Sequence, residues 1–117
     1  MMLSDDAFPV FGAIVLVPFP FTSQANSKQR PAAVISSQAY NAARPDIILM
    51  AITSQFRAAT SYGEIWIRNW QDAGLLRPSA VKPVIATLEQ ALIIRRLGTL
   101  TQQDQDALRQ AIREITG

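Results

Sequence analysis

Two short polar segments, each beside an apolar run, carry the side chains best suited to chemistry. Arg30 closes a polar stretch over residues 22–29, and Thr53 and Ser54 end an apolar run that begins at residue 46. A guanidinium is permanently charged and forked, so it can hold a phosphate through parallel hydrogen bonds. Hydroxyls can orient a reacting oxygen, although at a strand end they also bond their own backbone. The residue types favour phosphate chemistry, while an arginine beside a proline is also an ordinary loop residue.

The chemistry open to this chain is narrowed by two residue types that it lacks. The sequence contains no cysteine and no histidine. Thiolate nucleophiles, disulfides and cysteine metal sites are therefore excluded. Histidine acid-base catalysis, the Ser-His-Asp arrangement and most zinc sites are excluded as well.

The positive charge is concentrated in the middle of the sequence. The net charge is only +2, but between Lys28 and Arg96 basic residues outnumber acids by about two to one, and both ends are acidic. A basic middle fits a surface that binds a polyanion, and it also fits an ordinary soluble surface. The 117 residues, with 49% hydrophobic and 17% charged, predict one globular domain over 1–117.

An apolar run near the N-terminus, residues 8–21, resembles a leader segment in composition. It follows Asp5 and Asp6, is interrupted by three prolines, and is too short to span a bilayer. We therefore expect a protein of the cytoplasm without a membrane partner.

Short apolar or alternating runs indicate a mainly β protein. The expected strands lie at 12–17, 32–37, 46–53, 63–68, 80–88 and 92–97, with residues 40–45 as a connection. One helix is expected after Thr101 and Asp104, which form a capping-box pattern, with an apolar stripe at Leu108, Ala111, Ile112 and Ile115. The short spacing of the strands predicts a small antiparallel barrel followed by a C-terminal helix.

Four segments in this order resemble the PemK/MazF family of toxin endoribonucleases. They are Gly12–Thr22, Gln29–Ser36, Ala51–Ser54 and Gly74–Ser79, and the likeness runs over nearly the whole chain. None of the four is specific by itself, and their shared order and spacing carry the resemblance.

The resemblance implies an SH3-like barrel that forms a homodimer. It implies metal-independent cleavage of single-stranded RNA, with no cofactor, through attack by the 2′-hydroxyl of the RNA. It also implies a cognate antitoxin that wraps the toxin with a flexible segment and gives the complex its DNA-binding part. RNA carries its own nucleophile, so the protein must supply charge stabilisation and proton transfer.

The family pattern gives roles to three residues. Arg30 corresponds to the arginine that steadies the developing phosphate charge, and Thr53, with Ser54 beside it, corresponds to the active-site hydroxyl. Candidate RNA contacts, which would govern affinity more than base choice, are Gln24, Lys28, Arg57, Lys82 and Arg95.

One position departs from the family pattern. Some relatives place an arginine and an aspartate in the penultimate strand as acid-base partners. Here Lys82 can replace the basic partner, but no carboxylate follows it. The general base therefore stays open among Asp46, Glu64, Glu89, water and the arginine itself.

Two other functions remain open from the sequence. The first is a non-catalytic toxin of the same barrel fold that traps DNA gyrase through its C-terminal residues, without needing the Arg30 and Thr53 pair. The second is an inactive RNA-binding or purely regulatory module, which the missing carboxylate keeps open.

Overall fold

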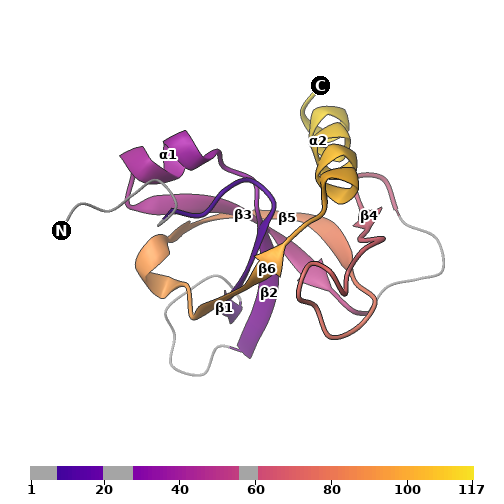
Figure 1. Ribbon diagram of the computed structural model, residues 1–117. Coiled ribbons are helices and arrows are strands. Elements are labelled where there is room, and N and C mark those ends of the chain that lie inside the picture. The colour runs from indigo at the N-terminus through magenta and orange to yellow at the C-terminus, as the bar shows by residue number, and fades with distance from the viewer. Residues whose placement is uncertain (1–7, 20–27, 56–60) are drawn as a thin grey trace.

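One curled antiparallel sheet of six strands organises the structure (Figure 1). The computed structural model describes residues 8–19, 28–55 and 61–117. The strands are β1 (Ala13–Phe19), β2 (Lys28–Val34), β3 (Asp46–Thr53), β4 (Ile65–Trp66), β5 (Ala80–Glu89) and β6 (Arg95–Thr99), and their order across the sheet is β4-β5-β3-β2-β1-β6. A mainly β fold with a C-terminal helix, as predicted, is confirmed.

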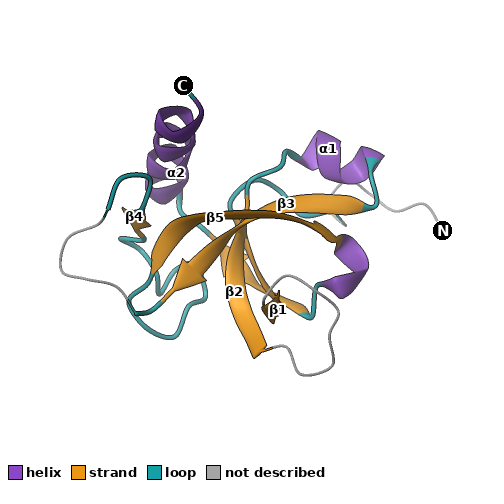
Figure 2. Ribbon diagram, turned by 180° about the vertical axis from the view of Figure 1, so that it is seen from behind, coloured by secondary structure: helices purple, strands orange, loops and turns teal. Residues whose placement is uncertain are grey.

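The sheet buries apolar side chains on both faces, because its curl and its covering elements enclose each face. Ile14 of β1, Met50 of β3 and Val81 of β5 belong to the cluster that packs against the C-terminal helix. Val15 and Leu49, their neighbours in sequence, belong to a second cluster closed by the 3-10 turn η2 (Gln90–Leu92) and the residue after it. Figure 2 shows β2, β3 and β5 crossing the middle of the molecule between these two layers.

β2 begins earlier than the sequence predicted. The expected strand starts at residue 32, whereas the observed one starts at Lys28, so Arg30 lies within a strand and pairs with Val17 of β1. Proline tolerates this position because β2 pairs with β3 only from Ala32 onward. Pro31 therefore faces no partner strand on that side, where its missing N–H costs no ladder hydrogen bond.

The connection expected at 40–45 contains a short helix, α1 (Gln38–Ala43). The side chain of Ser37 accepts a hydrogen bond from the backbone N–H of Tyr40, which caps the helix. Asn41, fully buried, donates to the carbonyl of Pro9 at 2.7 Å and fastens α1 to the start of β1. Ser37 followed by several alanines is a typical start of a helix. The prediction of a connection at 40–45 did not take this pattern into account.

Two further strands differ from the prediction. Of the alternating segment 63–68, only Ile65–Trp66 pairs with β5. The last strand lies at Arg95–Thr99 instead of 92–97, because residues 90–92 form the η2 turn. The strands at 46–53 and 80–88 were predicted within one residue of their observed bounds.

The C-terminal helix α2 (Gln102–Thr116) has the predicted apolar stripe. Leu108 and Ala111 are buried, and Ile112 and Ile115 pack against the same core. The predicted capping box is wrong, because the side chain of Thr101 makes no capping hydrogen bond to the helix backbone. The carboxylate of Asp104 instead accepts hydrogen bonds from a distant segment, as described below. Among the described residues, no helix is both long and apolar enough to cross a membrane.

Two glycines bring the connection between β4 and β5 against β6. Gly74 has a φ of +85°, and a Cβ placed there would lie 2.0 Å from the carbonyl oxygen of Leu97. A Cβ placed on Gly98 would lie 2.2 Å from the carbonyl oxygen of Ala73. Both distances are far shorter than a carbon and an oxygen can approach, so the contact requires glycine on both sides.

Replacing Gly98 with alanine is expected to destabilise the fold strongly. The added methyl must push the backbone of Ala73 away from β6, and overpacking of this kind costs about 2 kcal/mol or more, which lowers Tm by roughly 8 °C. Thermal denaturation followed by circular dichroism measures the change. Gly117→Ala is the matched control, because nothing lies within 4 Å of a Cβ there. Equal Tm values for the two variants would contradict the contact.

Candidate functional site

A pocket of about 380 Å³ collects side chains from five parts of the chain. It is lined by β1, the first half of β2, the end of β3, the connection before β5, and β6. The lining residues are Leu16, Gln29, Arg30, Pro31, Ile52, Ser54, Gly74, Leu75, Leu76, Arg77, Ser79, Arg95 and Leu97. Three residues that the sequence singled out for chemistry, Arg30, Ser54 and Arg95, therefore share one pocket.

Strand pairing explains why the backbones of Arg30 and Arg95 lie near each other, although the two residues are far apart in the sequence. β1 lies between β2 and β6 in the sheet. On one side Val17 pairs with Arg30, and on the other side Leu16 pairs with Arg95. Both arginines thus lie at the same end of β1 and are exposed, but on opposite faces of the sheet, because their partners Leu16 and Val17 are consecutive strand residues.

The connection between β4 and β5 forms the remaining wall and adds a third arginine, Arg77. The hydroxyl of Ser79 donates a 2.9 Å hydrogen bond to the backbone carbonyl of Arg77, which holds this part of the wall. The neighbouring Leu76 is 94% exposed at the pocket. Sequence analysis gave Arg77 no role. A signal was present, since Arg77-Pro78 repeats the Arg-Pro pair that drew attention to Arg30.

The two hydroxyl residues at the end of β3 have different surroundings. The hydroxyl of Thr53 accepts from the backbone N–H of Gln55 at 3.0 Å and donates to its carbonyl at 3.1 Å, so it closes a local turn. Ser54, inside that turn, is exposed and lines the pocket. Thr53 pairs with Ala80, which brings the turn beside Ser79. The geometry thus places Ser54 in the pocket and gives the Thr53 hydroxyl backbone partners.

The other candidate RNA contacts lie elsewhere. Lys28 is exposed at the start of β2 and is not part of the pocket lining. The ammonium of Lys82 lies 4.0 Å from a carboxylate oxygen of Glu64, outside the lining. Gln24 and Arg57 lie outside the described residues.

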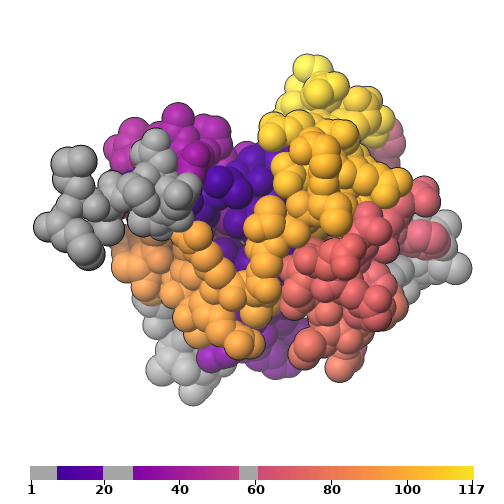
Figure 3. Space-filling model, in the orientation of Figure 1, coloured from indigo at the N-terminus to yellow at the C-terminus, as the bar shows by residue number. Residues whose placement is uncertain are grey.

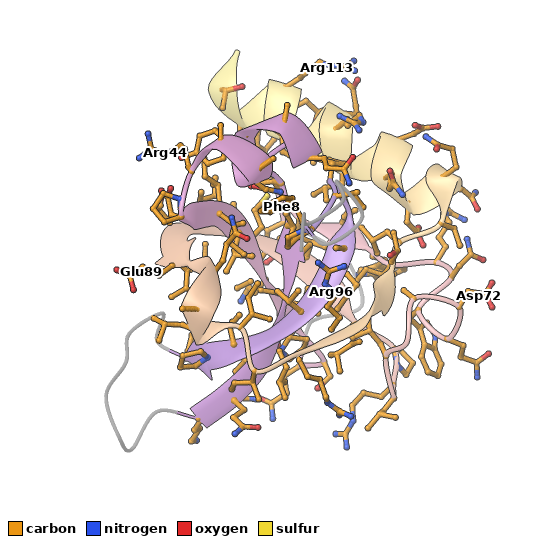
Figure 4. The ribbon with its side chains drawn as sticks, turned by 60° about the vertical axis from the view of Figure 1, so that its left-hand side comes forward. Phe8, Arg44, Asp72, Glu89, Arg96 and Arg113 are labelled. Carbon is orange, nitrogen blue, oxygen red and sulfur yellow. The ribbon has the colours of Figure 1, made fainter. Side chains whose placement is uncertain are left out.

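The pocket is strongly positive. Among the described residues, neither the lining nor the ion pairs include a carboxylate that neutralises Arg30, Arg77 or Arg95. The single acid between residues 68 and 79, Asp72, is exposed and points away from the body of the molecule (Figure 4). Arg30, Arg77 and Arg95 line this pocket with Ser54 and Ser79, and guanidinium and hydroxyl groups are the types that hold a phosphate and stabilise added negative charge on it.

The three carboxylates that the sequence left open as the general base, Asp46, Glu64 and Glu89, lie outside this pocket. Arg44 donates a 2.8 Å hydrogen bond to Asp46, which lowers the pKa of that carboxyl below its usual value and makes it a weak base. Glu64 accepts from the backbone N–H of Ser61 at 2.8 Å. Glu89 is exposed at the far end of β5 (Figure 4). None of them lines the pocket, and in the described part of the chain no three acidic, histidine or cysteine side chains gather as a metal site would require.

A second, wider groove of about 580 Å³ lies between α1 and α2. In the space-filling view it appears as a notch between the magenta and yellow helices, and its lining includes Val10 and Phe11 of the indigo segment that leads into β1 (Figure 3). Arg109 lies over the ring of Phe11, with 3.8 Å from its guanidinium carbon to the ring centroid, and forms part of one wall. This groove contains none of the residues that the sequence predicted for chemistry.

Three solved structures with a similar fold are distant from this chain in sequence. An endoribonuclease in complex with its cognate antitoxin from a mycobacterial species has a TM-score of 0.71 at 17% identity, over 89% of this chain and 90% of that one. The MazF toxin of Deinococcus radiodurans has a TM-score of 0.72 at 19% identity, over 94% and 97%. A MazF toxin of Mycobacterium tuberculosis has 0.67 at 22% identity, over 86% and 91%. At these identities the likeness establishes a shared fold.

The family is established by the sequence itself. No curated protein matches the chain significantly. The family model for the PemK-like, MazF-like toxins of type II toxin-antitoxin systems matches residues 11–116, which is nearly the whole chain. This agrees with the resemblance drawn from the four segments and with the shared fold. The chain therefore belongs to the PemK-like, MazF-like family of type II toxins.

Proposed function

We propose that this toxin is an endoribonuclease that cleaves single-stranded RNA without a metal ion or cofactor. The observation that carries the proposal is the pocket in which Arg30, Arg77 and Arg95 gather with Ser54 and without a carboxylate among the described lining residues. Family membership and the endoribonuclease relatives of the same fold support it.

The reaction begins with the 2′-hydroxyl of the RNA, which attacks the adjacent phosphorus. The O2′–P bond forms, the P–O5′ bond breaks, and the products carry a 2′,3′-cyclic phosphate and a 5′-hydroxyl. Negative charge rises on the phosphate oxygens in the transition state, where Arg30 and its neighbours stabilise it. Ser54 hydrogen-bonds a reacting oxygen. With no carboxylate in the described lining, water in the pocket takes the proton from the 2′-hydroxyl, and water also gives a proton to the 5′-oxygen as the P–O5′ bond breaks.

The proposal includes two protein partners. Structures of relatives contain a cognate antitoxin, and we infer that an antitoxin also blocks this pocket. The second partner is another copy of the chain. β5 leaves Val84 and Ile85 nearly half exposed, which provides apolar surface for a twofold dimer. We infer a cytoplasmic location, because the proposed RNA substrate and antitoxin are found there.

Arg30→Ala is expected to reduce RNA cleavage about a hundredfold or more, the size of effect seen when one preorganised charge-stabilising group is removed. The assay uses a mixed-sequence single-stranded RNA in EDTA, and the ends of the fragments are identified as 2′,3′-cyclic phosphates. Arg113→Ala removes one positive charge outside the pocket and is the matched control.

Three results of this assay would contradict the proposal in different ways. Equal cleavage by Arg30→Ala and the unmodified protein would remove Arg30 from the site. Intact RNA that is bound but not cut by the unmodified protein would favour an RNA-binding module. Intact RNA with inhibited DNA gyrase would favour the gyrase-trapping toxin.

The strand-end hydroxyls give a second prediction. Ser54→Ala is expected to lower kcat without unfolding the protein, because Ser54 is exposed in the pocket. Thr53→Val removes the turn that presents Ser54 and is expected to lower kcat as well, whereas Thr53→Ser retains the turn hydroxyl and most activity. Single-turnover cleavage rates measure all three. Unchanged rates in Ser54→Ala and Thr53→Val would exclude both hydroxyls from the mechanism.

Arg77→Ala tests the arginine that sequence analysis missed. Each phosphate contact to a single strand contributes about 0.7 to the slope of log K against log salt, so the variant is expected to bind more weakly and with a slope smaller by about that amount. The ligand is an oligonucleotide with 2′-deoxy sugars, which cannot be cleaved. Arg113→Ala, in the groove between α1 and α2, is the control and keeps the original slope.

A further inference from the structure

Asp104 is a buried carboxylate with an unusual set of partners. It lies in the first turn of α2 and is only 1% exposed. One carboxylate oxygen accepts the backbone N–H of Arg68 at 3.0 Å, and the other accepts the backbone N–H of Asn69 at 2.9 Å. Its backbone partners thus lie some 35 residues away, at the start of the connection that forms the pocket wall, and the hydroxyl of Thr101 donates to it at 3.4 Å.

The neighbours of Asp104 strengthen the same attachment. The side-chain amide of Asn69 donates to the hydroxyl of Thr101 at 2.9 Å and to the side-chain oxygen of Gln103 at 3.2 Å. No ion pair in the described part of the chain involves Asp104. Its negative charge is therefore offset by backbone N–H groups and by the positive end of the α2 dipole.

From this anchor a short, internally bonded turn leads to the pocket. The backbone N–H of Ala73 donates to the carbonyl of Asn69, and that of Leu75 donates to the carbonyl of Trp70 at 3.0 Å. The turn then rests on β6 through the contact of Gly74 with Leu97. A third backbone hydrogen bond, from the N–H of Ile67 to the carbonyl of Ser79 at 2.9 Å, closes the base of the connection.

These contacts restrict the backbone of residues 68–74, which connects Asp104 to the pocket wall. The turn is held at residues 68 and 69 by Asp104 and at Gly74 by β6, and the next residues along the chain are Leu75, Leu76 and Arg77 of the lining. A shift at the anchor must therefore move the wall, because the intervening residues are bonded to one another. No element between them offers a hinge.

We propose that Asp104 is a positioning residue for the phosphate pocket: it fixes the start of the 68–77 segment and through it the placement of Arg77. This rests on the proposed function of the pocket. A carboxylate suits the task because both of its oxygens accept and it donates nothing. An amide of the same shape accepts with only one oxygen, and its nitrogen would face a backbone N–H.

Asp104→Asn is the test, and Asp106→Asn is its matched control. Both changes remove one negative charge from the first part of α2, but Asp106 is exposed and accepts only from the side chain of Gln102. Asp104→Asn is expected to raise KM for RNA and to lower kcat/KM between about tenfold and about a hundredfold, the effect of a small displacement in a reactive geometry. Asp106→Asn is expected to keep both constants.

A second measurement separates positioning from mere loss of stability. In Asp104→Asn the amide NMR resonances of Gly74, Leu75, Leu76 and Arg77 are expected to shift at temperatures where the protein is fully folded. Asn69→Ala, which removes two side-chain hydrogen bonds but retains the backbone N–H, is expected to shift the same resonances less. A lower Tm for Asp104→Asn with unchanged KM and unchanged resonances would overturn the proposal.

The affinity for tripolyphosphate makes this test independent of RNA cleavage. Weaker binding of tripolyphosphate by Asp104→Asn than by Asp106→Asn supports the positioning role, whether or not the unmodified protein cuts RNA. A failure of the unmodified protein to cut RNA would contradict only the proposed function. Equal binding by the two variants would overturn the positioning role even if RNA is cut.

Discussion

The pairing of β1 with a strand on each side is the constraint on which the rest of the molecule depends. Since β1 lies between β2 and β6, residues of these two strands, which are far apart in the sequence, lie beside the same end of β1. The same strand supplies Ile14 to one core cluster and Val15 to the other. The two clusters therefore pack against opposite faces of β1. A shift of its register would move the side chains of β1 out of these clusters and would separate the pairings that hold Arg30 and Arg95 at one end of the strand.

The charge of the pocket opposes folding to a small extent and favours binding. Two unit charges 4 Å apart repel by roughly 1 kcal/mol in water and about 4 kcal/mol in the lower effective dielectric near a protein surface. Arg30, Arg77 and Arg95 are all exposed, so solvent weakens their mutual repulsion. An anion that enters removes the repulsion and gains attraction to all three, which makes an empty pocket the less favourable state.

The sequence predicted the parts that depend on local patterns. β3 follows from an unbroken apolar run, and α2 follows from the stripe through Leu108 and Ile112. Arg30 and Ser54 were recognised from residue type and family order, and the structure brings them into one pocket.

What the sequence missed depends on contacts between distant segments. Arg77 lines the pocket beside the place where Gly74 and Gly98 allow two backbones to touch, and the Arg77-Pro78 pair does not reveal that contact by itself. Asp104 stands where the carboxylate of a capping box would stand, because a carboxylate there can accept backbone N–H groups of its own helix or, as observed, those of the distant residues Arg68 and Asn69. The start of β2 was placed too late because a proline usually ends a strand, unless, as here, its partner on one side is absent.

The turn at Ala73 and Gly74 has one more consequence, for the solubility of the protein. An antiparallel sheet that does not close leaves two outer strands, whose free N–H and C=O groups invite other chains to add on and aggregate. One outer strand here, β4, has only two residues. The other, β6, begins with two arginines and lies against the 73–74 turn. A chain that is 49% hydrophobic therefore has no long, flat, apolar outer strand in its described part.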